Sequence, residues 1–169
     1  MFPDTYDFAN DATPRDIMQK MADEFDRKLT PEMRQQAADC NLSIYELVNL
    51  ASLVEKEARY PEDRPVIAQV FFKRLDINMP LQTDTTLQYL RDEVKEDLSI
   101  EDTLVESPYN TYLHYGLPPG PIASPGLASI EAVLHPADTD YLYFVADRDG
   151  HNHYGYNYDE HLDLVNQVR

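Results

Sequence analysis

The sequence predicts an α+β fold that is mostly helical and has a small β-sheet. Several segments open with a hydroxyl residue in a helix-capping pattern and then repeat apolar residues every three or four positions, as a buried helix face does. One run, residues 141–146 (YLYFVA), is rich in aromatic and β-branched residues, which favours a strand. With 169 residues, of which 43% are hydrophobic, the chain is long enough to bury a core as a single domain.

Three helices are predicted in the N-terminal part. Thr-Pro pairs begin the first two, over residues 13–28 and 30–38, because the hydroxyl caps the helix and proline fits its first turn. The third and longest begins at the capping box Ser43–Glu46 and ends at Tyr60-Pro61. Its buried face is expected to consist of Leu47, Leu50, Ala51, Val54 and Ala58.

The middle of the chain continues as helices and turns. A helix is expected over residues 63–75, where Asn78-Met79-Pro80 breaks the pattern. Another is expected over residues 85–94, followed by a short turn that Ser99 and Asp102 cap.

The C-terminal part opens with residues 107–126, which are too rich in proline, glycine and tyrosine for regular structure. A loop of this length in a folded domain is usually functional. A helix is then expected from Ser124-Pro125 to His135-Pro136, followed by the strand at 141–146 and a turn at Asp149-Gly150. A closing helix is expected over residues 160–168.

The net charge of −17, from 31 acidic and 14 basic residues, argues against binding to nucleic acid or to anionic lipid through a basic surface. The single cysteine excludes an intrachain disulfide and a cysteine metal site. No apolar run approaches the roughly 18 residues of a membrane span, and no signal peptide is visible. Phosphate-binding glycine loops and the serine-nucleophile motif GxSxG are also missing from the sequence.

Two glutamates, Glu55 and Glu57, end the longest predicted helix. They point about 200° apart, so they cannot serve one atom together, and both lie at the edge of the apolar stripe. A carboxyl among aliphatic neighbours loses hydration, which raises its pKa and suits a general acid. The alternative is a pair of boundary glutamates whose charges reach solvent, and helical spacing does not choose between the two interpretations.

Two loops carry candidate sugar contacts. Gln82, Thr83 and Asp84 follow a proline and could hydrogen-bond sugar hydroxyls or N-acetyl groups, although Thr83 and Asp84 are equally suited to cap the next helix. In the segment PYNTY, Tyr109 and Tyr112 could stack on sugar faces while Asn110 binds an amide. The alternative makes Asn110 a turn residue and the tyrosines loop anchors.

A third cluster lies near the C-terminus and contains His151, His153, Asp159, Glu160 and His161. Taken alone it suggests a metal-dependent hydrolase. A His-x-His pair in a loop lacks the helical i, i+4 spacing of stronger zinc motifs, so solvated histidines are the favoured interpretation.

The motifs EKE, LQTD, PYNTY, GLPPGPI and YLYFVA, together with the opening FPDTYDF, resemble the MltG (YceG-like) family of endolytic murein transglycosylases. The resemblance covers essentially the whole chain. It implies a lysozyme-like catalytic domain over residues 41–169, a helical lead-in over residues 1–40, and a LysM-like subdomain and membrane anchor before Phe2. It further implies that the protein lies at the extracytoplasmic face of the bacterial membrane and acts on peptidoglycan glycan strands. Cell-wall synthases are the expected partners, and no metal or cofactor is expected.

The resemblance also implies residue roles. Glu57 aligns with the catalytic acid and Glu55 becomes a supporting residue, while the cleft residues are Gln82, Thr83, Asp84, Tyr109 and Asn110. Three departures from the family pattern stand out: Ala58 replaces a common hydroxyl residue, Thr85 replaces a proline, and the His-x-Phe pattern falls on Asn152 and Tyr154. We expect Thr85 to alter only a turn.

The expected reaction is cleavage of the glycan with formation of a 1,6-anhydromuramyl end, in which the substrate supplies the second group that a glycosidase normally takes from a second carboxylate. The alternative from another class is a non-catalytic glycan-binding or scaffold module of the cell-wall synthesis machinery.

Overall fold

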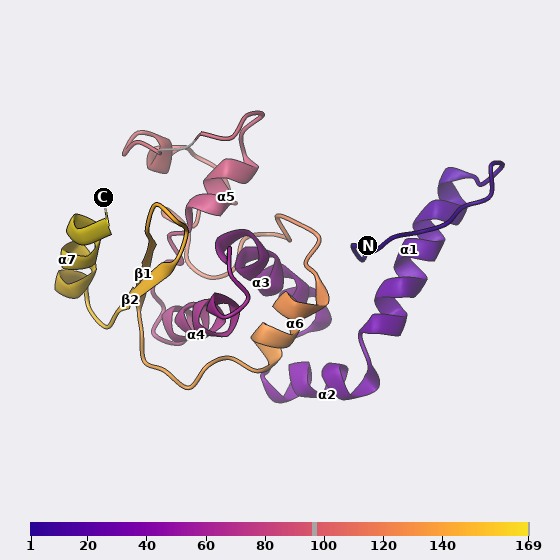
Figure 1. Ribbon diagram of the computed structural model, residues 1–169, viewed down its shortest axis with the longest axis horizontal. Helices are drawn as coiled ribbons and strands as arrows, with labels where there is room; N and C mark the ends of the chain where they lie inside the picture. Colours follow the sequence, from indigo (N-terminus) through magenta and orange to yellow (C-terminus); the bar gives the residue numbers. More distant parts are fainter. Residues whose placement is uncertain (96–97, 169) are drawn as a thin grey trace.

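The computed structural model describes residues 1–95 and 98–168, and within them helices and one two-stranded sheet form an α+β fold (Figure 1). The elements, in chain order, are α1 (Pro14–Lys28), α2 (Pro31–Asp39), α3 (Ile44–Glu57), α4 (Asp63–Asp76), α5 (Asp84–Tyr89), the 3₁₀ turn η1 (Asp102–Leu104), α6 (Leu127–Leu134), β1 (Tyr143–Ala146), β2 (Asn152–Gly155) and α7 (Tyr158–Val168). In the part of the chain that the structure describes, no helix is both long and apolar enough to cross a bilayer.

The core forms where α3, α4 and α6 pack together in the centre of the molecule (Figure 1). Each buried aliphatic side chain contributes about 1.5–3 kcal/mol through loss of contact with water. Residues 47–54 of α3 are buried almost all round, which explains why this part of its sequence is so apolar. The fully buried members include Leu47, Leu50, Leu53, Ile67, Phe71, Ile130 and Val133.

The predicted helix starts of α1, α2 and α3 are confirmed. Thr13 and Ser43 form capping boxes with Asp16 and Glu46, and the Thr30 hydroxyl accepts a hydrogen bond from the Met33 amide. Helix α1 has no buried residue and lies at one end of the molecule, away from the sheet (Figure 1). The proposed division of the chain at residue 40 stays a prediction.

The predicted strand at 141–146 is present as β1, over residues 143–146, whereas its partner β2 was not predicted. The two strands are antiparallel, with Tyr143 opposite Gly155 and Ala146 opposite Asn152. The interpretation of His151 and His153 as a pair in a loop was wrong for His153, because the Asp149-Gly150 turn reverses the chain and residues 152–155 pair with β1; Gly150 has a φ of 87°. Helix α7 then packs against both strands.

The boundaries of helices α5 and α7 differ from the prediction. Helix α5 ends at Tyr89 instead of continuing to residue 94, because the Gln88 side chain binds both the backbone N–H and the carbonyl of Lys95 and turns the chain. Helix α7 begins two residues early, at Tyr158, because the Asn157 side chain accepts the Glu160 N–H at 2.9 Å.

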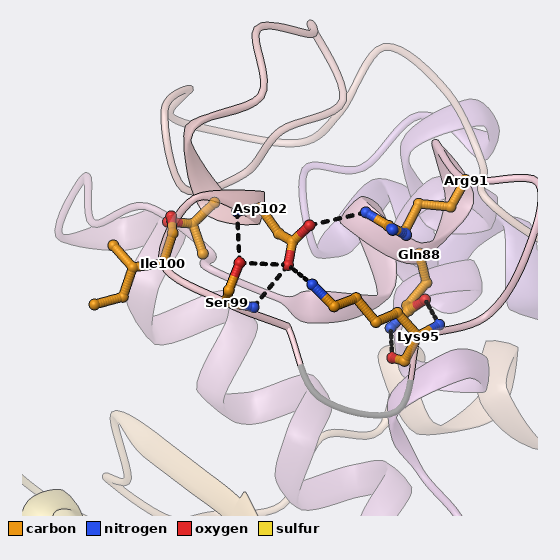
Figure 2. A network of polar contacts seen from close by, with 7 residues as sticks. Gln88, Arg91, Lys95, Ser99, Ile100 and Asp102 are labelled. Carbon is orange, nitrogen blue, oxygen red and sulfur yellow. Dashed lines mark hydrogen bonds and ion pairs between the residues drawn. The ribbon is translucent and has the colours of Figure 1, made fainter.

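Residues 90–95 and 98–106 form an excursion from the core that is held by one carboxylate. The Asp102 carboxylate accepts hydrogen bonds from the Arg91 guanidinium at 2.9 Å and from the Lys95 ammonium. It also accepts the backbone N–H and the hydroxyl of Ser99, each at 2.7 Å (Figure 2). These contacts confirm the predicted turn capped by Ser99 and Asp102, and they hold the pKa of Asp102 well below its usual range. Apolar side chains of this excursion, Val94 and Ile100, are largely exposed.

Candidate active site

Glu57 is the last residue of α3, and its carboxyl turns toward the beginning of α5. Its Oε1 atom accepts hydrogen bonds from the hydroxyls of Thr83 and Thr85, the latter at 2.8 Å. The helix ends directly afterwards, because Ala58 has an extended backbone conformation. The acid is therefore half-buried and held by two short side chains from another segment.

The environment of Glu57 raises the pKa of its carboxyl. Loss of hydration is the main cause, and the nearby negative charge of Asp84 acts in the same direction. The hydrogen bonds from Thr83 and Thr85 oppose this effect because they stabilise the ionised form. Burial prevails, so the carboxyl is biased toward the protonated state that a general acid needs.

The LQTD loop is fixed in front of Glu57 by Thr111. The Thr111 carbonyl accepts the Gln82 N–H at 3.0 Å, and the Thr111 hydroxyl accepts the Thr83 N–H at 3.1 Å. Gln82 adopts a φ of 47°, an unusual conformation for a residue with a side chain. Thr83 is only 3% exposed, so its hydroxyl serves Glu57 and is shielded from a ligand.

A cleft of about 1300 Å³ opens beside Glu57. One side is formed by the end of α3 and the LQTD loop, and the other by β1 and α7. Its polar lining includes Glu57, Gln82, Asp84, Tyr112, Tyr143 and Tyr158. The acid therefore lies at the wall of a groove that has polar groups on both sides.

Arg74 joins three segments at the base of this cleft. Its guanidinium donates to the Leu142 carbonyl at 2.7 Å and to the Leu81 carbonyl at 2.6 Å, and it lies 5.2 Å from the centre of the Tyr143 ring. Arg74 is 6% exposed, and burial lowers its pKa. These contacts fix the LQTD loop and the sheet on opposite sides of the groove.

Tyr112 also lines the cleft and donates its hydroxyl to Asp84. Burial and this hydrogen bond raise the pKa of Tyr112 above its usual value. The phenol thus remains a proton donor over the physiological range and fixes the direction of the Asp84 carboxylate.

A family model described as the YceG-like family matches residues 1–167. The chain belongs to the YceG-like family. The endolytic murein transglycosylase of Bacillus subtilis (strain 168) is 42% identical over 154 residues, which cover 89% of this chain and 42% of that protein. The endolytic murein transglycosylase of Streptococcus pneumoniae serotype 2 (strain D39) is 38% identical over 167 residues, which cover 95% of this chain and 30% of that protein.

A solved structure has the same fold. The crystal structure of a putative yceG-like protein from Listeria monocytogenes superposes with a TM-score of 0.89 at 38% identity and covers 96% of this chain and 53% of that one. The chain thus spans less than half the length of these two curated relatives and about half of the solved one.

Of the predicted site residues of this YceG-like chain, Glu57, Gln82, Thr83 and Asp84 come together at the cleft. Glu55 does not. Its Oε2 atom accepts the Gly126 N–H at 3.1 Å and the Ser129 hydroxyl at 2.6 Å, at the beginning of α6. Glu55 therefore caps a neighbouring helix, and α6 begins at Leu127 instead of directly after Pro125.

The structure also places Tyr109 and Asn110 away from the cleft lining. Asn110 is fully buried; its amide nitrogen donates to the Thr103 and Val105 carbonyls at 2.9 and 2.8 Å, and its oxygen accepts the Tyr112 N–H at 2.9 Å. The Tyr109 ring packs against Tyr89 at 5.1 Å. The loop-anchor alternative describes both residues better than direct contact with sugar.

The C-terminal histidines do not converge. The His151 ring stacks on Tyr60 at 4.0 Å, and His153 contacts Asp147 at 3.1 Å, whereas His161 packs against Tyr143 at the cleft. Among the described residues, no group of three or more His, Cys, Asp or Glu side chains is placed to hold a metal ion.

Sequence reasoning missed the contributions of Thr85, Thr111 and Arg74. The sequence pattern predicts that Thr85 alters only a turn, whereas its hydroxyl contacts the acid directly. Thr111 lies inside the PYNTY motif, so proximity in sequence to Asn110 was a usable signal. Nothing in the local pattern of α4 marks Arg74, because its partners are carbonyls from distant segments.

Proposed function

We propose that this chain is the catalytic part of an endolytic lytic transglycosylase that cuts peptidoglycan glycan strands between MurNAc and GlcNAc. The observation that carries the proposal is the half-buried Glu57 carboxyl, with its raised pKa, at the wall of a large polar cleft. The names of the two curated relatives support the same substrate class.

In the first step Glu57 protonates the glycosidic oxygen that leaves from MurNAc. A protonated carboxyl is needed at this point, and the desolvated environment of Glu57 favours it. The bond between the anomeric carbon and that oxygen then breaks, which leaves Glu57 as a carboxylate.

In the second step the Glu57 carboxylate accepts the proton of the muramic 6-hydroxyl, and this oxygen closes on the anomeric carbon. The product is a 1,6-anhydromuramyl end, and no water is consumed. A retaining or inverting hydrolase instead uses a second carboxylate as nucleophile or base. Asp84 and Asp147 are the carboxylates of the cleft lining that could take such a role, and one oxygen of Asp84, Oδ1, already accepts the Tyr112 hydroxyl.

The cleft fits a polymer better than a small ligand. Typical small-molecule pockets measure about 300–1000 Å³, and this one has about 1300 Å³ and is open to solvent between the LQTD loop and α7. Gln82 and Asp84 are exposed on one side and Tyr158 on the other, which provides polar and aromatic groups for sugar rings. An enzyme of this kind works in the bacterial cell envelope, at the outer face of the membrane and beside the cell-wall synthases.

The proposal is tested with purified glycan strands and mass analysis of the chain ends. Wild-type protein is expected to form anhydromuramyl ends. Glu57→Gln is expected to lower the rate by about 100-fold or more, because it removes the general acid. Glu55→Gln is the matched control, because it makes the same chemical change at a glutamate whose partners lie at the beginning of α6. The rate of this variant is expected to remain within a few-fold of the wild-type rate.

Two outcomes would contradict this assignment. Hydrated reducing ends as the sole product would identify a hydrolase. Binding of glycan without any cutting, by wild type and Glu57→Gln alike, would favour the non-catalytic scaffold module.

A further inference from the structure

The hydroxyl of Thr85 contacts the proposed acid, although the residue is not part of the cleft lining. Its Oγ1 atom lies 2.8 Å from Glu57 Oε1 and 2.6 Å from the hydroxyl of Thr83, which also binds Oε1. Position 85 is the second residue of α5, and its backbone N–H also acts on Glu57 and lowers the pKa of the acid. One residue thus supplies two interactions to one carboxyl.

Both hydroxyl contacts reach the same oxygen of Glu57. Among the hydrogen bonds of the described residues, none reaches Oε2. Since Glu57 lines the cleft, Oε2 is the oxygen available to a ligand there.

We propose that Thr85 is a positioning residue for Glu57: it fixes Oε1 at the beginning of α5 and thereby presents Oε2 to the glycosidic oxygen. This inference rests on the proposed function. It adds a residue that acts through the acid and does not touch the substrate.

Other charged or titratable groups face Glu57 from the surrounding elements. They are Asp84 of α5, Arg74 of α4 and Tyr112 of the 107–126 loop, with Asp147, Arg148 and His161 on the opposite side of the cleft. These groups remain unchanged when Thr85 is substituted. A change in the titration of Glu57 therefore reports the loss of the Thr85 contact.

Three variants separate the two interactions of Thr85. Thr85→Val keeps the shape and the backbone N–H but removes the hydroxyl, whereas Thr85→Ser keeps the hydroxyl. Thr85→Pro removes both donors, and proline is tolerated in the first turn of a helix. Thermal unfolding of each variant verifies that the fold is retained.

The first readout is independent of activity. The carboxyl carbon resonance of Glu57, assigned from its loss in Glu57→Gln, is followed by NMR as a function of pH. The Glu57 pKa is expected to rise in Thr85→Val, because a hydrogen bond to the ionised carboxylate is lost, and to rise further in Thr85→Pro, which also lacks the backbone N–H. In Thr85→Ser the hydroxyl is kept, so the pKa is expected to remain near the wild-type value.

The second readout is glycan cleavage. In Thr85→Val we expect kcat at neutral pH to fall roughly threefold to tenfold, as the loss of one hydrogen bond predicts, and the alkaline limb of the pH profile to move upward. KM is expected to change little, and Thr85→Ser is expected to restore kcat.

The outcomes distinguish the two proposals. If wild type cuts glycan but Thr85→Val has an unchanged titration and pH profile, Thr85 has no positioning role and the proposed function stands. If Glu57 titrates as expected but wild type leaves glycan intact, the proposed function fails and the catalytic role of Thr85 fails with it.

Discussion

At the scale of single residues, two glutamates separated by one lysine occupy different environments. Glu57 accepts threonine hydroxyls at a cleft, and its pKa is raised by loss of hydration. Glu55 accepts a backbone N–H and a serine hydroxyl at the beginning of α6. The partners in space, and not the residue type, separate the proposed acid from the structural carboxylate.

The raised pKa of Glu57 predicts a pH-dependent gain in stability for Glu57→Gln. An unfolded glutamate ionises near pH 4.3, whereas folded Glu57 holds its proton to higher pH. Between these two values the folded wild type binds more protons than the unfolded chain, so its stability falls as pH rises. Chemical denaturation from pH 4 to 8 is expected to show Glu57→Gln gaining on wild type through this window and keeping the advantage above it.

Glu55→Gln serves as the control for this measurement, because its surroundings differ while the chemical change is the same. A constant difference between Glu57→Gln and wild type at all pH values would contradict the raised pKa. If the stability advantage of Glu57→Gln over wild type shrinks as pH rises, the pKa of Glu57 is lowered in the folded protein and not raised.

The sequence predicted the location of these residues better than their roles. EKE and LQTD were expected to form one site, and Glu57 and Thr83 do lie in contact. For Thr83 the sequence leaves open contact with sugar or the cap of the next helix; the residue is buried at the N-cap position of α5, and its hydroxyl binds the acid instead of the helix amides. Such roles depend on which side chains meet across long loops, and local spacing contains no information about that.

At the scale of elements, the loop 107–126 is ordered by one buried amide. The Asn110 amide nitrogen donates to the Thr103 and Val105 carbonyls at the end of the excursion. Its oxygen accepts the Tyr112 N–H, and the Tyr112 hydroxyl in turn reaches Asp84 at the cleft. The polar network of Figure 2 secures the other side of that excursion through Asp102. The long loop is therefore a structural continuation of the cleft wall.

Asn110→Ala is expected to destabilise the protein by about 1–3 kcal/mol, because Asn110 is fully buried and the substitution leaves two carbonyls and one N–H, all partly buried, without their partner. Urea denaturation measures the effect, with the exposed Asn166→Ala on α7 as the control, which is expected to change stability by no more than about 0.5 kcal/mol. A loss below 1 kcal/mol for Asn110→Ala would mean that water replaces the lost contacts. It would also reopen a direct role for this residue toward sugar.

Helices with strong start signals were predicted well from the sequence, since capping boxes and Thr-Pro pairs act over a few residues. The elements that differed are set by side-chain caps or strand pairings that lack so clear a signal, and the start of α7 is one of them, because it depends on the Asn157 side chain. Strand β2 requires β1 as its partner, and the end of α5 is set by the bond between Gln88 and Lys95.

At the scale of the whole molecule, the charge is strongly unbalanced. The chain carries a net charge of −17, and its described ion pairs lie at or near the surface, where each contributes little. Arg74 is a buried cation at the cleft and donates to backbone carbonyls. Excess acidic residues thus repel one another over the rest of the surface.

This imbalance predicts that added salt stabilises the fold. Raising sodium chloride from low ionic strength shortens the range of repulsion from about 30 Å at 0.01 M to about 8 Å at 0.15 M. The midpoint of thermal unfolding at pH 7.5 is expected to rise over this interval by several degrees and then to level off. A midpoint that falls with salt would show that attractive pairs dominate, contrary to the composition.

The positive φ of Gln82 lowers the stability of the fold at the cleft wall. A φ of 47° suits glycine, and a residue with a side chain incurs a conformational penalty of order 1 kcal/mol to remain there. Glycine would remove that penalty, but it would also remove the amide that projects into the groove. The fold therefore keeps a strained residue at the cleft wall, as binding surfaces often do, and this agrees with the contact to glycan that we propose for Gln82.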